Sequence, residues 1–156
     1  VRWASRTLFP DLLARGIRVS LGADGAACNN RLDMFTEMRT AALLQKALHG
    51  PEVLPANRVL RMATIDGARA MSLDAEVGSL EVRKRADVSV VRLDRLHATP
   101  VKDVVSALVY SAETEDVDTV LIDGELAMRD RKLLTIDERE TIESARVQAA
   151  NLMDLK

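Results

Sequence analysis

The chain has 156 residues, which is enough for one ordinary domain and too few for a complete α/β barrel of about 250 residues. Hydrophobic residues make up 47% and charged residues 29% of the sequence, a balance typical of a soluble globular protein. The formal net charge of −2 gives no electrostatic reason to bind nucleic acid or an anionic membrane, so we expect neither partner.

The sequence also bears on the cellular compartment. No apolar run approaches the roughly 20 residues that span a bilayer, and no charged-then-apolar leader opens the chain, so we expect neither a membrane span nor a secretory signal. The single cysteine, Cys28, excludes an internal disulfide and agrees with a reducing compartment, which predicts a cytoplasmic protein. The chain begins at Val1 instead of Met, which agrees with removal of the methionine or trimming of a tag and also with a chain cut from something longer.

The first predicted elements alternate between helix and strand. Residues 9–15 are expected to form the end of a helix that Gly16 terminates, and residues 17–21 a short buried strand with β-branched side chains. The loop 22–30 follows, rich in glycine and asparagine. A helix then begins near Asn30 or Asp33, either of which can accept backbone N–H bonds as a cap.

This helix is expected to continue to about residue 48, where Gly50-Pro51 prevents it from extending. One of its faces carries apolar side chains at helical spacing: Phe35, Met38, Ala41, Ala42 and Leu48. We expect the methionine and phenylalanine residues at 34, 35 and 38 to belong to the core, not to a ligand pocket. Pro55 suits the first residue of another helix, and residues 64–71 predict a second short one.

After Ser72 the pattern favours strands. Residues 86–93 and 104–110 are rich in valine, and residues 117–122 and 125–128 flank Asp123-Gly124, the strongest short hairpin signal because both residues tolerate positive φ. Residues 135–138 read Thr-Ile-Asp-Glu, a capping box that predicts a closing helix. That helix has an apolar stripe made of Ile142, Ala145, Ala149 and Leu152.

Asp24 is the leading candidate for chemistry, because it directly follows the expected strand at its carboxyl end, where α/β barrels hold their active sites. A carboxylate can ligate a divalent cation and accept a proton from the water that the cation acidifies. The alternative is structural, since an aspartate in such a loop commonly forms a turn or caps a helix.

The other reactive side chains have weaker cases. The two histidines, His49 and His97, lack the spacing of metal ligands, and we interpret both as structural. Cys28 has no local cationic group to form a thiolate, so it is expected to line the loop. Asn29 and Asn30 either fix the loop or cap the helix, or else contact a substrate.

Several motifs carry a family resemblance. Residues 21–30, 32–39, 41–46 and 62–70 are similar to the amidohydrolase superfamily, in particular to the branch of methylthioadenosine/S-adenosylhomocysteine deaminases, guanine deaminases and triazine chlorohydrolases. The likeness continues through residues 78–81, 84–87, 108–110 and 120–124. It covers the chain from about Leu12 to Ala150 but only the C-terminal third of such an enzyme, because the His-x-His pair, two further histidines and the general-acid glutamate of the family are missing.

The resemblance implies the fold class: α/β, the C-terminal fragment of a (β/α)8 metal-dependent hydrolase barrel, followed by part of a small β-sandwich and a C-terminal helix. Residues 1–72 would hold the last barrel strand and its flanking helices, residues 73–134 half of the sandwich, and residues 135–156 the helix. Asp24 would bind the single divalent metal, Zn or Fe, and shuttle the proton in the complete enzyme, with Asn29 and Asn30 near the substrate. We expect this chain alone to bind no metal.

Three residues depart from the family pattern. Cys28 replaces a common serine, Ser72 a common glycine, and Arg83 the usual glycine of a turn. Arginine at Arg83 would cost about 1 kcal/mol if the turn keeps a positive φ. These departures affect turn geometry and leave Asp24 untouched.

Two functions follow. The first is the C-terminal part of an amidohydrolase that cleaves a C–N or C–Cl bond on a purine- or triazine-like ring through a metal-activated water, with the isolated chain inactive and its N-terminal barrel segment missing. The alternative is a non-catalytic structural or interaction module, which self-associates because its parallel-strand edges and apolar face are uncovered. A stand-alone α/β binding domain is a third possibility, which the ordered motifs disfavour.

Overall fold

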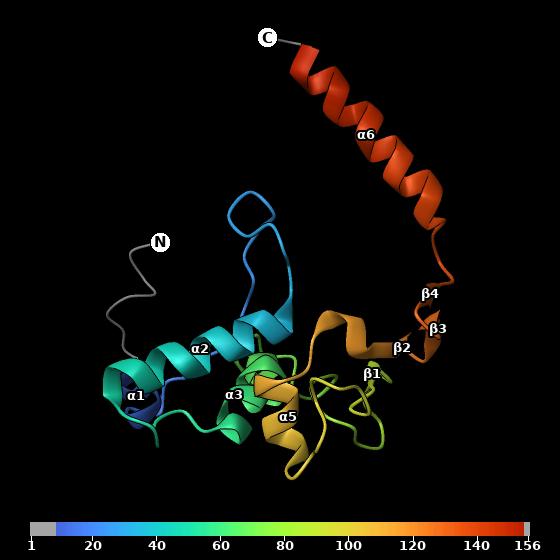
Figure 1. Cartoon of the computed structure of the whole chain (residues 1–156). Helices are drawn as coiled ribbons and strands as arrows, with labels where there is room; N and C mark the ends of the chain where they lie inside the picture. Colours follow the sequence, from blue (N-terminus) through green and yellow to red (C-terminus); the bar gives the residue numbers. More distant parts are fainter. Residues whose placement is uncertain (1–8, 155–156) are drawn as a thin grey trace.

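The computed structural model describes residues 9–154 of the chain (Figure 1). Its first half is helical, with α1 (Phe9–Ala14), α2 (Met34–His49), α3 (Ala56–Ala63) and α4 (Ile65–Ala70) close to the predicted positions. Asp33 begins α2, because its carboxylate accepts bonds from the Phe35 N–H at 2.9 Å and the Thr36 hydroxyl at 2.6 Å. Gly16 at φ 73° and Gly50 at φ 102° end α1 and α2 in conformations that suit glycine.

The hydrophobic core lies where α2, α3 and the later helix α5 (Val104–Tyr110) meet. Its buried members include Met38, Ala42, Val59, Met62 and Val109. The face predicted for α2 is therefore confirmed at Met38, Ala41 and Ala42, and is wrong at Leu48, which is exposed. Gln45 takes the buried place on the last turns of this face.

The predicted strand at residues 17–21 is not a strand in the described part of the chain. The segment is extended, and the Leu21 N–H donates to the Met62 carbonyl at 3.2 Å, but no neighbouring strand pairs with it. A β-strand requires a ladder of bonds to a second strand. The strand prediction is therefore not met within residues 9–154, where no partner strand is present to pair with the segment.

A four-stranded antiparallel sheet forms the second half, in the order β1 (Val88–Val91), β2 (Val117–Ile122), β3 (Glu125–Arg129) and β4 (Lys132–Leu133). The hairpin predicted around Asp123-Gly124 is confirmed, with φ values of 52° and 83° at these two residues. Positive φ at both central residues matches the twist of the paired strands. Ser72 and Arg83, which replace glycines common in the family, also have positive φ, 60° and 82°.

The strand predicted at residues 104–110 is wrong, because these residues form the helix α5. Asp103 caps it by accepting a 2.8 Å bond from the Ser106 N–H. Packing of Ala107 and Val109 into the core outweighs the preference of valine for strands.

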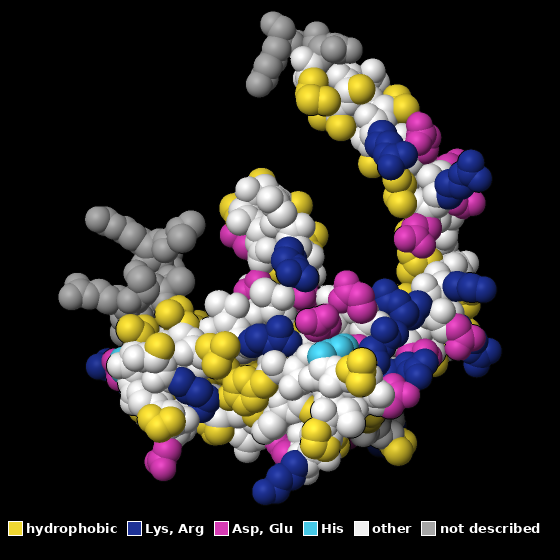
Figure 2. All heavy atoms as spheres, in the orientation of Figure 1, with side chains coloured by type: hydrophobic (Ala, Val, Ile, Leu, Met, Phe, Trp, Pro, Cys, Tyr) yellow, Lys and Arg dark blue, Asp and Glu magenta, His cyan; other side chains and the backbone are white. Residues whose placement is uncertain are grey.

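The last helix, α6 (Glu138–Asp154), extends away from the rest of the chain (Figure 1). It begins at Glu138 with Asp137 as its cap, since the Asp137 carboxylate accepts from the Glu140 N–H at 2.9 Å, so the predicted start at Thr135 is three residues early. Its predicted apolar stripe is present but exposed, and in Figure 2 apolar side chains lie along its surface among charged ones. Between residues 9 and 154, no helix combines the length and apolarity needed to cross a membrane.

Candidate functional site

The loop that carries Asp24 joins the extended segment 17–21 to α2 and rises above the helices in Figure 1. Asp24 has φ 61°, a left-handed conformation that few residues other than glycine, asparagine and aspartate adopt. Its side chain is exposed, and its Oδ1 accepts a 2.7 Å bond from the Gly25 N–H. Oδ2 has no hydrogen-bond partner in the described part of the protein and is open to solvent.

A tight turn follows Asp24. The Gly25 carbonyl accepts bonds from the Cys28 N–H at 2.9 Å and the Asn29 N–H at 3.0 Å. The Asn29 side chain points back to the protein: its Nδ2 donates to Glu37 Oε1 at 2.6 Å, and its Oδ1 accepts from the Arg31 N–H at 3.2 Å. Asn29 therefore fixes the loop to α2, whereas Asn30 and Cys28 are exposed.

Glu37 is the residue of this site that the sequence reasoning missed. It lies in the first turn of α2, where an acidic side chain suits the helix N-terminus. The eight-residue separation from Asn29 matches no local motif, so only the path of the loop brings the two side chains together.

Asp24 has the chemistry of one oxygen ligand, but it does not make a metal site by itself. Among the residues described, no group of three or more histidine, cysteine, aspartate or glutamate side chains is placed to hold an ion. Zinc in proteins takes about three or four protein ligands. The described residues therefore fit a divalent metal only as contributors of a single carboxylate.

The two histidines lie on other parts of the chain. His49 is exposed in the last turn of α2. His97 Nε2 lies 2.7 Å from Asp116 Oδ2, and Arg95 Nε lies 3.3 Å from Asp116 Oδ1. Asp116 is buried in the short turn before β2. Burial alone would raise its pKa, but the bonds from His97 and from the Glu113 N–H outweigh it, so the pKa of Asp116 lies below its usual range.

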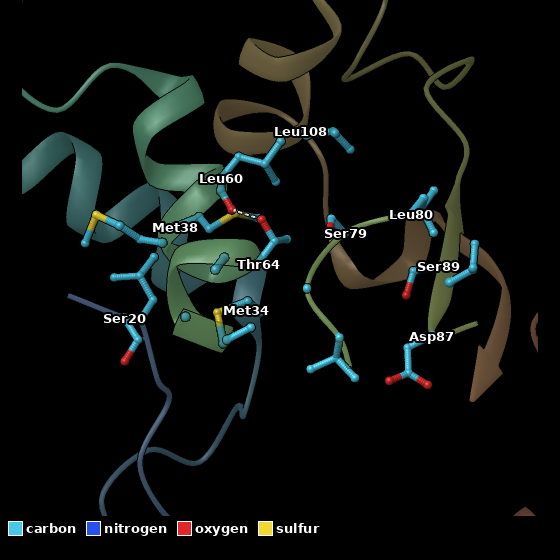
Figure 3. A pocket seen from close by; sticks show the side chains of 18 of the residues that line it. Ser20, Met34, Met38, Leu60, Thr64, Ser79, Leu80, Asp87, Ser89 and Leu108 are labelled. Atoms are coloured by element: carbon cyan, nitrogen blue, oxygen red, sulfur yellow. Dashed lines mark hydrogen bonds between the residues drawn. The ribbon is translucent and has the colours of Figure 1, made fainter. Parts of the chain in front are cut away.

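An apolar hollow of about 720 Å³ separates the helices from β1 (Figure 3). In Figure 3, Met34, Met38 and Leu60 line one wall, and Leu80, Asp87 and Ser89 stand on the opposite side. Met38 is buried in the core and Phe35 packs against it, as predicted. Met34, Phe35 and Met38 also line the hollow. Asp24 is not among the residues that line it.

The comparisons with known proteins identify the class of protein. The model of the amidohydrolase family matches residues 5–127, which include Asp24, Asn29 and Asn30. This match covers more than half of the chain, and the chain therefore belongs to the amidohydrolase family.

Three similar proteins show which members of the family this chain resembles. A 5-methylthioadenosine/S-adenosylhomocysteine deaminase from Desulforudis audaxviator is 51% identical over 144 residues, covering 92% of this chain and 34% of the relative. An adenosine deaminase structure from Xanthomonas campestris with bound zinc has a TM-score of 0.88 and 38% identity, over 92% of this chain and 33% of that one. A zinc complex of an atrazine chlorohydrolase from Arthrobacter aurescens has a TM-score of 0.80 and 25% identity, over 86% of this chain and 30% of that one.

These findings confirm the recognised family and the fold class. The chain spans about a third of the length of the curated relatives it matches, as the sequence motifs predicted. The relatives include both deaminases and a chlorohydrolase, in agreement with the predicted branch. The roles of Asp24, Asn29 and Asn30, and the divisions at residues 72 and 134, stay predictions.

Proposed function

We propose that this chain is the C-terminal third of a metal-dependent amidohydrolase that deaminates a purine-like ring. The observation that supports it most is the 51% identity to a 5-methylthioadenosine/S-adenosylhomocysteine deaminase over nearly the whole chain. Dechlorination of a triazine-like ring is the weaker form of the proposal, since the chlorohydrolase structure is only 25% identical. In this proposal, residues 1–72 would complete the barrel and residues 73–134 would form half of a β-sandwich. The whole protein would act in the cytoplasm.

Asp24 is the residue of this chain that we place in the chemistry. A bound zinc or iron ion would lower the pKa of a coordinated water to near 7. The exposed carboxylate supplies one oxygen ligand and can hold a proton at Oδ2, while the Gly25 N–H fixes Oδ1 at 2.7 Å. The imidazole ligands must come from the upstream part of the longer protein, because the described residues provide no ligand cluster.

The alternative is a module without catalysis that self-associates. The apolar hollow of about 720 Å³ favours it, as do exposed side chains such as Leu80 and Val82, which are 76% and 94% accessible. Exposed apolar side chains beside such a hollow are commonly covered by another protein segment.

One experiment separates the two functions. Ring deamination, metal content and molecular mass are measured on the 156-residue chain and on the longer protein extended by its upstream segment. We expect turnover and bound metal only in the longer protein. Turnover by the 156-residue chain contradicts the proposed division of the site. A longer protein that binds no metal and self-associates without turnover supports the module.

A further inference from the structure

We propose that Glu37 and Asn29 are positioning residues that hold the Asp24 carboxylate in place from helix α2. The expected effect on turnover rests on the proposed function, whereas the expected effect on the order of the loop rests on the structure alone. It also assigns to Asn29 a role in loop order and not in direct substrate contact.

A continuous path of hydrogen bonds joins α2 to Asp24. Glu37 Oε1 accepts from Asn29 Nδ2 at 2.6 Å, and the Asn29 N–H donates to the Gly25 carbonyl at 3.0 Å. The Gly25 N–H in turn donates to Asp24 Oδ1 at 2.7 Å. Each bond begins on the residue where the preceding one ends, so the carboxylate is oriented by a side chain on a regular helix.

The Glu37 bond is the principal tie between this loop and α2. Residues 24–28 and 30–32 are exposed, whereas Asn29 is half-buried. The other hydrogen bonds of the loop stay within it, from Gly25 to Cys28 and from Asn29 to Arg31. A longer ion pair of 3.9 Å joins the exposed Arg31 side chain to Asp33, the cap of α2. Asp33 caps α2 and so holds the residues that follow the loop, but it does not contact the turn that orients Asp24.

The arrangement suits positioning because a bond that holds one carboxylate oxygen leaves the other free. A catalytic group must keep its geometry closely, and a displacement of about 1 Å can cost about 100-fold in rate. Since Asp24 sits on an exposed loop with a left-handed backbone, a tie to a stable helix supplies the order that the loop itself lacks.

The test on the full 156-residue chain compares Glu37→Ala with Glu37→Gln, which keeps a carbonyl acceptor. In Glu37→Ala we expect the backbone order parameters of Gly25 and Cys28 to fall from about 0.85 to below about 0.6. Trypsin should cut after Arg31, whose side chain is 70% exposed, at least about fivefold faster. Glu37→Gln should restore both values. Thr40→Ala, at an exposed position of the same helix, is the matched control.

Asn29→Ala tests the same path from its other end and should reproduce the loop loosening with α2 unchanged. Unaltered order and cleavage in both Glu37→Ala and Asn29→Ala overturn the inference. In the longer protein, Glu37→Ala should lower kcat about tenfold with KM unchanged, and Glu37→Gln should recover most of it.

The two proposals fail in different ways. If Asp24→Asn keeps full turnover while Glu37→Ala loosens the loop, the proposed role of Asp24 in the chemistry is wrong and the positioning of the loop is supported. If Asp24→Asn abolishes turnover while Glu37→Ala leaves both loop and kcat unchanged, the positioning is wrong and the proposed function is supported.

Discussion

Two aspartates mark two regions of this molecule that are built in opposite ways. Asp24 lies on an exposed loop, with one oxygen bound by the next residue and the other open. Asp116 is buried beside β2, within 3.3 Å of Arg95 and 2.7 Å of His97, and also accepts from the Glu113 N–H. The same side chain is exposed with an open oxygen in one region, and buried against charged and hydrogen-bonding partners in the other.

The difference teaches how to separate functional from structural acids in this fold. A carboxylate whose partners are all supplied by the chain stabilises the fold, and changing it should reduce the free energy of unfolding. A carboxylate with an open oxygen on a loop contributes little to folding, so changing it should leave the stability intact and affect only a reaction.

The largest expected effect is on turnover. Asp24→Asn in the longer protein should lower kcat by about 1000-fold, because the amide cannot take up a proton as the carboxylate can. The free energy of unfolding should change by less than about 0.5 kcal/mol, since the side chain is exposed. Steady-state deamination and urea unfolding check the two values. Asp11→Asn, another exposed aspartate, should leave turnover unchanged, and equal losses in both variants would contradict a specific role for Asp24.

The second effect is on stability. Asp116→Ala should lower the free energy of unfolding by about 2 kcal/mol, because it removes a buried carboxylate that accepts from the Glu113 N–H and pairs with Arg95 and His97. Asp94→Ala removes an exposed ion pair with Arg92 and should cost less than about 1 kcal/mol. Urea unfolding of the two variants measures the difference. Equal losses would mean that burial of Asp116 does not distinguish it from a surface acid.

The third effect is a dependence of stability on pH. The folded-state pKa of Asp116 is lowered, so its contribution is complete above its ordinary pKa of about 3.9 and is lost as the pH falls through the folded-state value. Between these two values the unfolded chain binds more protons, and stability rises with pH. The slope should be smaller in Asp116→Ala, as measured by urea unfolding between about pH 2 and pH 5. Parallel curves for the two proteins would exclude this contribution.

The smallest expected effect is an increase in the free energy of unfolding. Arg83→Gly should stabilise the chain by about 1 kcal/mol, because arginine at φ 82° carries a strain that glycine avoids. Arg83→Ala keeps the strain and removes the same exposed charge, so it should give no gain. Thermal unfolding of the pair checks the prediction. A gain of the same size in Arg83→Ala would assign the effect to charge instead of backbone strain.

The sequence predicted best the elements whose signals are local. Asp33 caps α2, and Asp123-Gly124 turns the hairpin, because each acts on residues within a few positions. The valine-rich segment 104–110 became a helix because packing against α3 and the Asp103 cap decided its conformation. The segment 17–21 needs a neighbouring strand that residues 9–154 do not supply.

In the candidate site too, local features could be predicted from the sequence and long-range contacts could not. Asp24 could be selected from its place after an apolar run and before a glycine-rich loop, and its left-handed backbone agrees with a residue type that tolerates that conformation. The bond from Asn29 to Glu37 could not be predicted, since it depends on how an exposed loop folds back onto a helix. A contact between two polar side chains on different elements produces no periodic pattern in the sequence.

The apolar hollow between the helices and β1 has a consequence for biogenesis. Both of its walls belong to this chain, the helical wall from residues 20–73 and the facing wall from residues 77–117. During synthesis the helical wall leaves the ribosome first, and its apolar side chains stay uncovered until the later residues fold against them. Chaperones bind and aggregation begins in such an interval. The yield of the protein in cells would therefore depend on how fast residues 77–117 are translated and docked.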